Sequence, residues 1–192
     1  MPRSVFRILV FAVAWTAVQN LGAASRTIDT EHSTLTVFVY KSGLFSALAD
    51  DHVIDAKIAS GSISEEAPQS IAVEVRSADL RVRDPNLSEK RRDEVQMRML
   101  GPEVLDAGRY PMVRFESTSV EVKTADRFEV TGRLTIHGQT RALTLPVDRV
   151  NGRYRGSVKL KQTDYGIAPI NIAGGSVKVR DEIRIDFDVA VK

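Results

Sequence analysis

Apolar and polar residues alternate with a period of two through almost the whole chain after Arg26. Leu35, Val37 and Val39 show this spacing, and it recurs in the stretches 71–75 and 183–189. Because successive side chains of a β-strand point to opposite faces, each stretch places its apolar side chains on one face. The pattern predicts about eight strands, each with one apolar face.

Strands of this kind that follow one another without crossover helices are typical of an antiparallel sheet. Turn signals separate them, among them Ser60-Gly61-Ser62, Asn151-Gly152 and Gly174-Gly175. Eight such strands can close into a barrel, and two packed sheets would show the same alternation. Periodicity alone therefore leaves both architectures open for an all-β domain.

The exception to the alternation lies between residues 83 and 110. Ser88 is a suitable N-cap for a helix over residues 89–100, and Gly101 would end it. Most of this segment is charged, and its apolar stripe is formed by Leu87, Val95 and Met99. We expect a short helix that lies over the sheet with its outer side in water.

The first residues have the order of a secretory signal peptide. Arg3 and Arg7 precede an apolar run over residues 8–15, and the small residues 22–24 follow. The apolar run is shorter than the roughly 20 residues that a transmembrane helix needs. We expect residues 1–24 to be removed, and residues 25–192 to form a single periplasmic or secreted domain without stable membrane insertion.

The charge balance argues against nucleic-acid partners. The chain has 27 Lys and Arg against 25 Asp and Glu, and residues 1–24 contain two of the arginines and none of the acids. The remaining chain therefore has a formal net charge of zero, which gives no long-range attraction for phosphate backbones. The absence of cysteine excludes disulfides and thiolate metal sites.

Catalytic signals are weak. His32, His52 and His137 are far apart in the sequence, and no G-x-S-x-G or G-x-G-x-x-G motif is present. His52 follows Asp50 and Asp51, so a metal-dependent enzyme centred on His52 is an alternative of a different class. We expect no catalytic residues, no metal and no enzyme activity.

Four segments, in this order, resemble the YceI-like family. They are Ile28-Asp29-x-x-His32-Ser33, Tyr110-Pro111-x-Val113-x-Phe115-x-Ser117, Leu134-Thr135-Ile136-His137-Gly138-Gln139-Thr140-Arg141 with Leu143-Thr144-Leu145-Pro146-Val147 after it, and Asp164-Tyr165-Gly166-Ile167. The likeness covers residues 27–192, and the helix around Arg92-Asp93 is in the family's place. The chain departs from the commoner family pattern at residues 43–53.

Members of that family are small exported proteins with a lipocalin-like antiparallel barrel, and some bind a long polyisoprenoid lipid along the barrel axis. The resemblance implies an eight-stranded lipocalin-like barrel here, with the short helix lying over it. It also implies an apolar lipid as the partner, and no cofactor other than a bound polyisoprenoid.

The inward-facing residues are largely Val, Leu and Ile, together with the rings of Phe115, Phe128 and Phe187, and such a lining suits an apolar guest. We predict that the strands line the cavity with Leu35, Val37, Val39, Phe45, Ile54, Val73, Val113, Phe115, Leu134, Ile136, Leu143, Leu145, Val158 and Leu160. Val95, Met99 and Leu100 of the helix are expected to close its entrance. The predicted protein sequesters or carries an isoprenoid-like lipid. The alternative is a barrel filled by its own side chains that acts as a stress-related interaction module.

Lys90, Arg91 and Arg92 could receive an anionic headgroup at the mouth of the barrel. The favoured interpretation is an ordinary solvated helix face, because acidic residues alternate with these cations. The sequence does not specify an oligomeric state.

Overall fold

The computed structural model describes residues 25–42, 51–172 and 177–192. The predicted signal peptide (1–24), the predicted lining residue Phe45 and the Gly174-Gly175 turn lie outside the described residues. Their predicted roles stay predictions.

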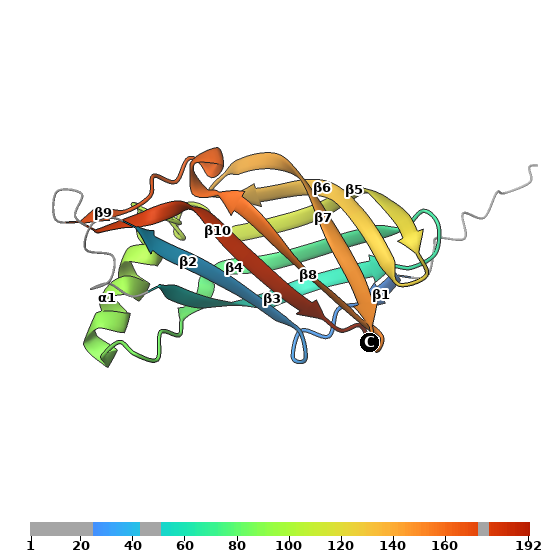
Figure 1. Cartoon of the computed structure of the whole chain (residues 1–192), viewed down its shortest axis with the longest axis horizontal. Helices are drawn as coiled ribbons and strands as arrows, with labels where there is room; N and C mark the ends of the chain where they lie inside the picture. The colour runs from blue at the N-terminus through green and yellow to red at the C-terminus, as the bar shows by residue number, and fades with distance from the viewer. Residues whose placement is uncertain (1–24, 43–50, 173–176) are drawn as a thin grey trace, which may run out of the picture.

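Eight antiparallel strands close into a barrel (Figure 1). They are β2 (Thr34–Ser42), β3 (His52–Ser64), β4 (Ser70–Val82), β5 (Met112–Thr124), β6 (Arg127–Ile136), β7 (Gln139–Val150), β8 (Arg153–Lys161) and β10 (Val177–Val189). The order is β3-β2-β10-β8-β7-β6-β5-β4, and pairing of β3 with β4 completes the circle. The predicted barrel is confirmed, and this closure rules out the two-sheet sandwich. Two short strands, β1 (Ser25–Thr27) and β9 (Asn171–Ile172), pair with β3 and β10.

The connections divide the barrel into two different ends. The helix end carries α1 (Glu89–Leu100), the β6–β7 turn and the short 3-10 helix η2 (Gln162–Tyr165). The far end carries the β3–β4, β5–β6 and β7–β8 turns, and the C-terminus lies beside it (Figure 1).

Helix α1 forms as predicted and covers an open strand edge. Ser88 caps it by accepting a hydrogen bond from the Arg91 amide. Strand β4 pairs with β5 only over residues 72–76, so the following part of this edge lacks a partner strand. The Gln96 side chain bonds there, accepting from the Val82 amide and donating to the Leu80 carbonyl, each over 2.8 Å. The exposed edge of a strand can pair with strands of other chains, and α1 covers this edge of β4.

The predicted turn at Ser60-Gly61-Ser62 is wrong, because these residues lie inside β3, at an irregularity in its pairing with β4. A Cβ on Gly61 would approach Ile28 Cδ1 to 2.6 Å and the Ala72 carbonyl to 2.7 Å. Gly61 therefore lies where two chain segments approach each other closely. Glycine inside a strand is common at such positions.

The Asn151-Gly152 turn is confirmed. Its φ angles of 52° and 75° are both positive, as a two-residue type I′ hairpin requires. His137 and Gly138 form the same kind of turn between β6 and β7, with φ angles of 50° and 71°. Each of the two turns joins strands that follow one another in the sequence and pair side by side in the barrel.

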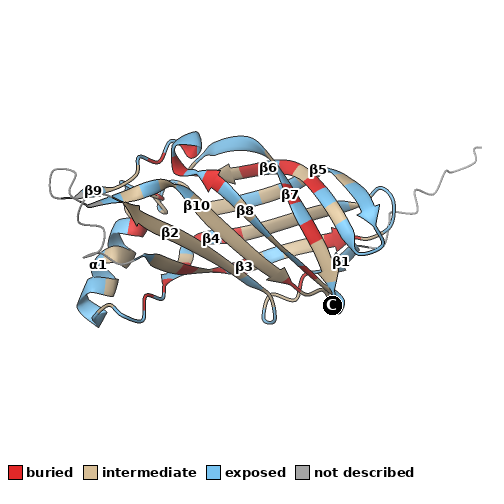
Figure 2. Ribbon diagram, in the orientation of Figure 1, coloured by how far each residue is buried: buried red, intermediate tan, exposed pale blue. Residues whose placement is uncertain are grey.

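The core is the inner surface of the barrel. Its buried residues form two clusters, one toward the helix end around Leu80, Met99 and Tyr165, and one toward the far end around Ile58 and Val130. Figure 2 shows buried positions spaced along the strands and an exposed outer side of α1. Among the residues that the structure describes, no helix has the length and apolar character needed to cross a membrane.

Candidate functional site: an apolar cavity inside the barrel

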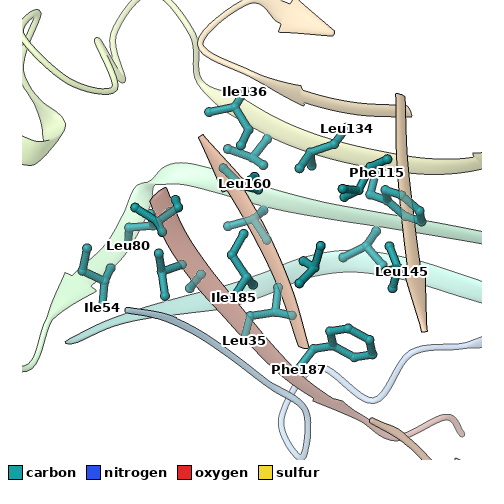
Figure 3. Close-up of a pocket in the computed structure, with 18 of the residues that line it drawn as sticks. Leu35, Ile54, Leu80, Phe115, Leu134, Ile136, Leu145, Leu160, Ile185 and Phe187 are labelled. Carbon is teal, nitrogen blue, oxygen red and sulfur yellow. The ribbon is translucent and has the colours of Figure 1, made fainter. Parts of the chain in front are cut away.

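An apolar cavity of about 240 Å³ occupies the lumen. Each of the eight barrel strands contributes side chains to its wall, and Figure 3 shows them directed into the space that the strands enclose. Met99 and Tyr165 belong to the wall at the helix end, and Val130 and Tyr154 at the far end. The cavity therefore runs along the barrel.

The structure brings most of the predicted lining residues together around this cavity. They are Leu35, Val37, Val39, Ile54, Val73, Met99, Val113, Phe115, Leu134, Ile136, Leu143, Leu145, Val158 and Leu160. Val95 and Leu100 do not line it; they pack against the core cluster at the helix end. The prediction that Phe128 faces this lumen is wrong, because its side chain borders a second cavity at the far end.

The predicted lining left out wall residues of two kinds. Some lie on strands, where the period-two spacing was sufficient to include them, among them Ile183, Ile185 and Val189 of β10. A second group comes from irregular segments at the helix end, where no periodicity exists to identify them: Val104, Leu105, Tyr165 and Ile167.

Two phenyl rings lie close to the wall of the barrel because glycines leave room for them. A Cβ on Gly132 would meet the Phe115 ring at 2.5 Å and the Glu116 carbonyl at 2.6 Å. A Cβ on Gly156 would likewise collide with the ring of Phe187, the residue paired with it across the strands. The two rings can therefore lie over backbone, and the centre of the lumen stays open.

The polar side chains of the wall are few. The Tyr154 hydroxyl donates to Glu65 Oε1 over 2.6 Å, and Gln162 Nε2 donates to the Arg180 carbonyl over 2.8 Å. Burial, together with the Glu65 carboxylate, raises the pKa of Tyr154 to about 12, and burial also raises the pKa of Tyr165. Both phenols are therefore neutral at physiological pH, and the part of the wall that the structure describes presents no charge to a guest.

The basic cluster of α1 does not reach the cavity. Lys90 and Arg91 are exposed, Arg92 is half-buried, and none of the three lines the wall. Lys90 and Arg91 face solvent because the stripe of the helix that packs on the barrel is formed by Val95 and Met99. The interpretation as a solvated helix face fits this placement better than a headgroup site at the cavity.

The three histidines lie in separate settings. His52 Nδ1 pairs with the buried Asp84 over 2.6 Å, and Asp84 also accepts from the Val53 amide. His32 pairs with Asp29, and His137 lies in the β6–β7 turn against the Tyr110 ring. Within the described ranges no three His, Asp or Glu residues are grouped as a metal site would require.

Comparisons with known proteins agree with this architecture. The model of the YceI-like domain family matches residues 27–191. A UPF0312 protein of Vibrio cholerae is 26% identical over 176 residues, covering 74% of this chain and 89% of that protein. A UPF0312 protein of Shewanella oneidensis is 28% identical over 185 residues, covering 87% of this chain and 88% of the relative.

Among solved structures, BcnA of Burkholderia cenocepacia has a similar fold. It aligns with a TM-score of 0.60 over 84% of this chain and 98% of BcnA, at 18% identity. This likeness supports the barrel fold, and the family match over nearly the whole described chain confirms the resemblance seen in the sequence. The chain belongs to the YceI-like domain family.

Proposed function

We propose that this protein binds an apolar, isoprenoid-like lipid in the lumen of its barrel, as an exported carrier or sequestering protein. The observation that carries the proposal is the chemistry of the wall. Apart from Gln162, Tyr154 and Tyr165, every described residue that lines the cavity has an aliphatic or phenyl side chain or is Met99. A long hydrocarbon tail matches both this surface and the extended course of the cavity.

The free energy of binding would come from partition. Each buried methylene contributes roughly 0.8 kcal/mol, from which the cost of ordering the tail is subtracted. A charged or strongly polar guest would lose its hydration without finding partners in this wall. Isoprenoid-like tails, which contain only hydrocarbon, incur no such penalty.

The alternative of a barrel filled by its own side chains is less well supported. Small eight-stranded barrels either pack solid or hold one small ligand, and this lumen retains a cavity of about 240 Å³. Gly132 and Gly156 also argue for an open lumen, because they let the rings of Phe115 and Phe187 lie against the wall.

Export belongs to the same proposal. The arginines, apolar run and small residues of positions 1–24 support cleavage and a periplasmic or secreted location. An exported protein with an apolar cavity could hold a lipid in the aqueous space outside the inner membrane.

The test is native mass spectrometry of protein purified without detergent from the periplasm of its own cells, followed by solvent extraction. We expect a mass excess that extracts as a prenyl lipid, on a polypeptide lacking residues 1–24. A bare polypeptide mass, in a preparation that also fails to take up a long prenyl alcohol after delipidation, would contradict the binding proposal. A full-length mass would contradict cleavage.

A further inference from the structure

A second cavity lies at the far end of the barrel, where the β3–β4, β5–β6 and β7–β8 turns meet. Its volume is about 230 Å³. Ile63, Ile71, Val130, Val147 and Tyr154 line both this cavity and the main lumen. A single layer of side chains therefore separates the two spaces.

The chemistry of the far cavity differs from that of the lumen. Val122 and Phe128 give it an apolar side, whereas Glu65, Gln69 and Arg149 add polar groups that the lumen lacks. Val122 is 54% exposed, which is unusual for a large apolar residue in this protein. The cavity thus combines an apolar rim with hydrogen-bonding groups.

Each charge in the wall has a nearby partner of opposite sign. Glu65 Oε1 accepts from Tyr154 over 2.6 Å and from Arg26 over 3.0 Å. Arg149 donates to Asp126 over 3.1 Å and to the Ala125 carbonyl over 3.1 Å. The hydrogen bond from Tyr154, helped by Arg26 and by the nearby charge of Arg149, holds the pKa of Glu65 below its ordinary value, so the carboxylate is ionised at neutral pH.

This balance selects against charged guests. An anion would approach the Glu65 carboxylate, and a cation would approach Arg26 and Arg149, so either would disturb a site that is already neutral overall. An uncharged hydroxyl can donate to a carboxylate and accept from a guanidinium at the same time. Its apolar body would meet Phe128 and Val122.

We propose that the far cavity binds an uncharged hydroxyl group attached to an apolar body, with the guest hydroxyl beside the Tyr154 hydroxyl and within reach of Glu65 and Arg149. Two sources share this chemistry. The group could be the hydroxyl end of a lipid whose tail lies in the main lumen, which rests on the function proposed above. It could equally be a separate small alcohol or phenol, which does not rest on it.

The test uses four probes of nearly equal shape on delipidated protein: naphthol, naphthalene, naphthoate and naphthylmethylammonium. We expect naphthol to bind at least about tenfold more tightly than each of the others, a difference of about 1.4 kcal/mol. In Glu65→Ala this preference for naphthol should fall, and naphthoate should gain affinity because the net charge of Arg26, Arg149 and Asp126 is positive. Glu66→Ala is the matched control, since Glu66 is exposed in the same turn and does not line the cavity.

Arg149→Met, which keeps Glu65, provides a second variant if Glu65→Ala does not fold; it should lower naphthol affinity and raise that of naphthylmethylammonium. The proposal is overturned if naphthol binds no better than naphthalene, or if its preference survives both substitutions. Ile136→Arg, in the main lumen, should leave naphthol binding intact while preventing tail binding, which separates failure here from failure of the lipid proposal.

The two sources are distinguished with a long prenyl alcohol and the matching hydrocarbon. If the hydroxyl is the end of the lumen lipid, the alcohol displaces naphthol, and Glu65→Ala removes its advantage over the hydrocarbon. If the occupant is a separate small molecule, naphthol and the prenyl alcohol bind together. Both results support the proposed site.

Discussion

Single side chains in the lumen determine what the cavity can accept. Ile136 is 8% exposed and belongs to the cavity wall, whereas its neighbour Thr135 faces outward and bonds Thr140 across the hairpin. The alternation of the strand thus offers two adjacent positions with opposite roles. A charge placed at one enters the lumen, and at the other it enters solvent.

We expect Ile136→Arg to lower affinity for a prenyl alcohol by at least about tenfold, because a buried guanidinium lacks partners in an apolar wall. Thr135→Arg should change affinity by less than about twofold, since the half-buried Thr135 lies outside the cavity wall and substitutions on the outer surface have small effects. Equilibrium binding to delipidated protein measures both, with circular dichroism as the check on folding. Where Ile136→Arg does not fold, Val158→Thr introduces a hydroxyl at nearly constant volume. Equal affinity of the folded variants would show that this face does not hold the ligand.

The Tyr154–Glu65 hydrogen bond gives stability a specific pH dependence. The pKa of Glu65 is lowered from 4.5, so its contribution is present above about pH 4.5 and is lost as pH falls through the folded-state pKa. The pKa of Tyr154 is raised from 10.0 to about 12, so its contribution is complete below pH 10 and is lost as pH rises through 12.

We therefore expect Tyr154→Phe to lower the free energy of unfolding by about 1 to 2 kcal/mol at neutral pH. The difference from the unsubstituted protein should shrink at either pH extreme. Urea unfolding over a pH series measures it, with Tyr40→Phe as the control because Tyr40 lies on β2 outside the cavity wall. A difference independent of pH would mean that the hydroxyl contributes by packing alone.

At the level of the strands, glycine positions set the width of the lumen. Gly132 of β6 accommodates the Phe115 ring of β5, and the neighbouring backbone carbonyl of Glu116 leaves equally little space. A side chain at this position has to displace a ring, a strand or both. By contrast, a Cβ on Gly108 would meet no atom within 4 Å.

We expect Gly132→Ala to cost about 1 to 3 kcal/mol of stability, the usual range for overpacking, and to weaken lipid binding as the Phe115 ring moves inward. Adding Phe115→Leu should recover part of both losses by making room for the new methyl group. Thermal unfolding and lipid titration follow the series, and Gly108→Ala should behave as the unsubstituted protein. If Phe115→Leu gives no recovery, the contact with the ring is not the cause.

For the molecule as a whole, an open lumen has a cost in stability. Core cavities cost on the order of 24 cal/mol per Å³, so a dry cavity of about 240 Å³ costs on the order of 6 kcal/mol. That is comparable to the total stability of a typical domain, about 5 to 15 kcal/mol. A guest that fills the lumen should therefore stabilise the protein visibly.

Delipidated protein should gain about 2.7 kcal/mol when a ligand is present at about 100 times its Kd. For a chain of this size, that corresponds to a rise in Tm of roughly 5 to 10 °C. Differential scanning calorimetry with and without a long prenyl alcohol measures the shift, and Ile136→Arg should show none. An unchanged Tm at saturating alcohol would contradict lipid binding in the lumen.

The local features of this fold were accessible from the sequence because each depends on neighbouring residues. Alternation identified the inward face of the strands, Ser88 and Gly101 bounded the helix, and Asn151-Gly152 marked a turn whose positive φ angles few other residue pairs adopt. Most of the lumen wall followed from the same period. The Ser60-Gly61-Ser62 prediction was wrong for a related reason: a glycine needed for contact with Ile28 looks the same locally as one needed for a turn.

Other features depended on contacts between distant segments, and only the tertiary structure shows them. Pairing of β2 with β10 joins the two ends of the chain, and pairing of β3 with β4 closes the circle, whereas a sandwich would satisfy the same alternation. Val104, Leu105 and Ile167 enter the wall from irregular segments whose direction is set by packing. The far cavity arises where three turns meet, because hydrogen-bond register around a closed barrel places Glu65, Arg149 and Tyr154 together although they are distant in the sequence.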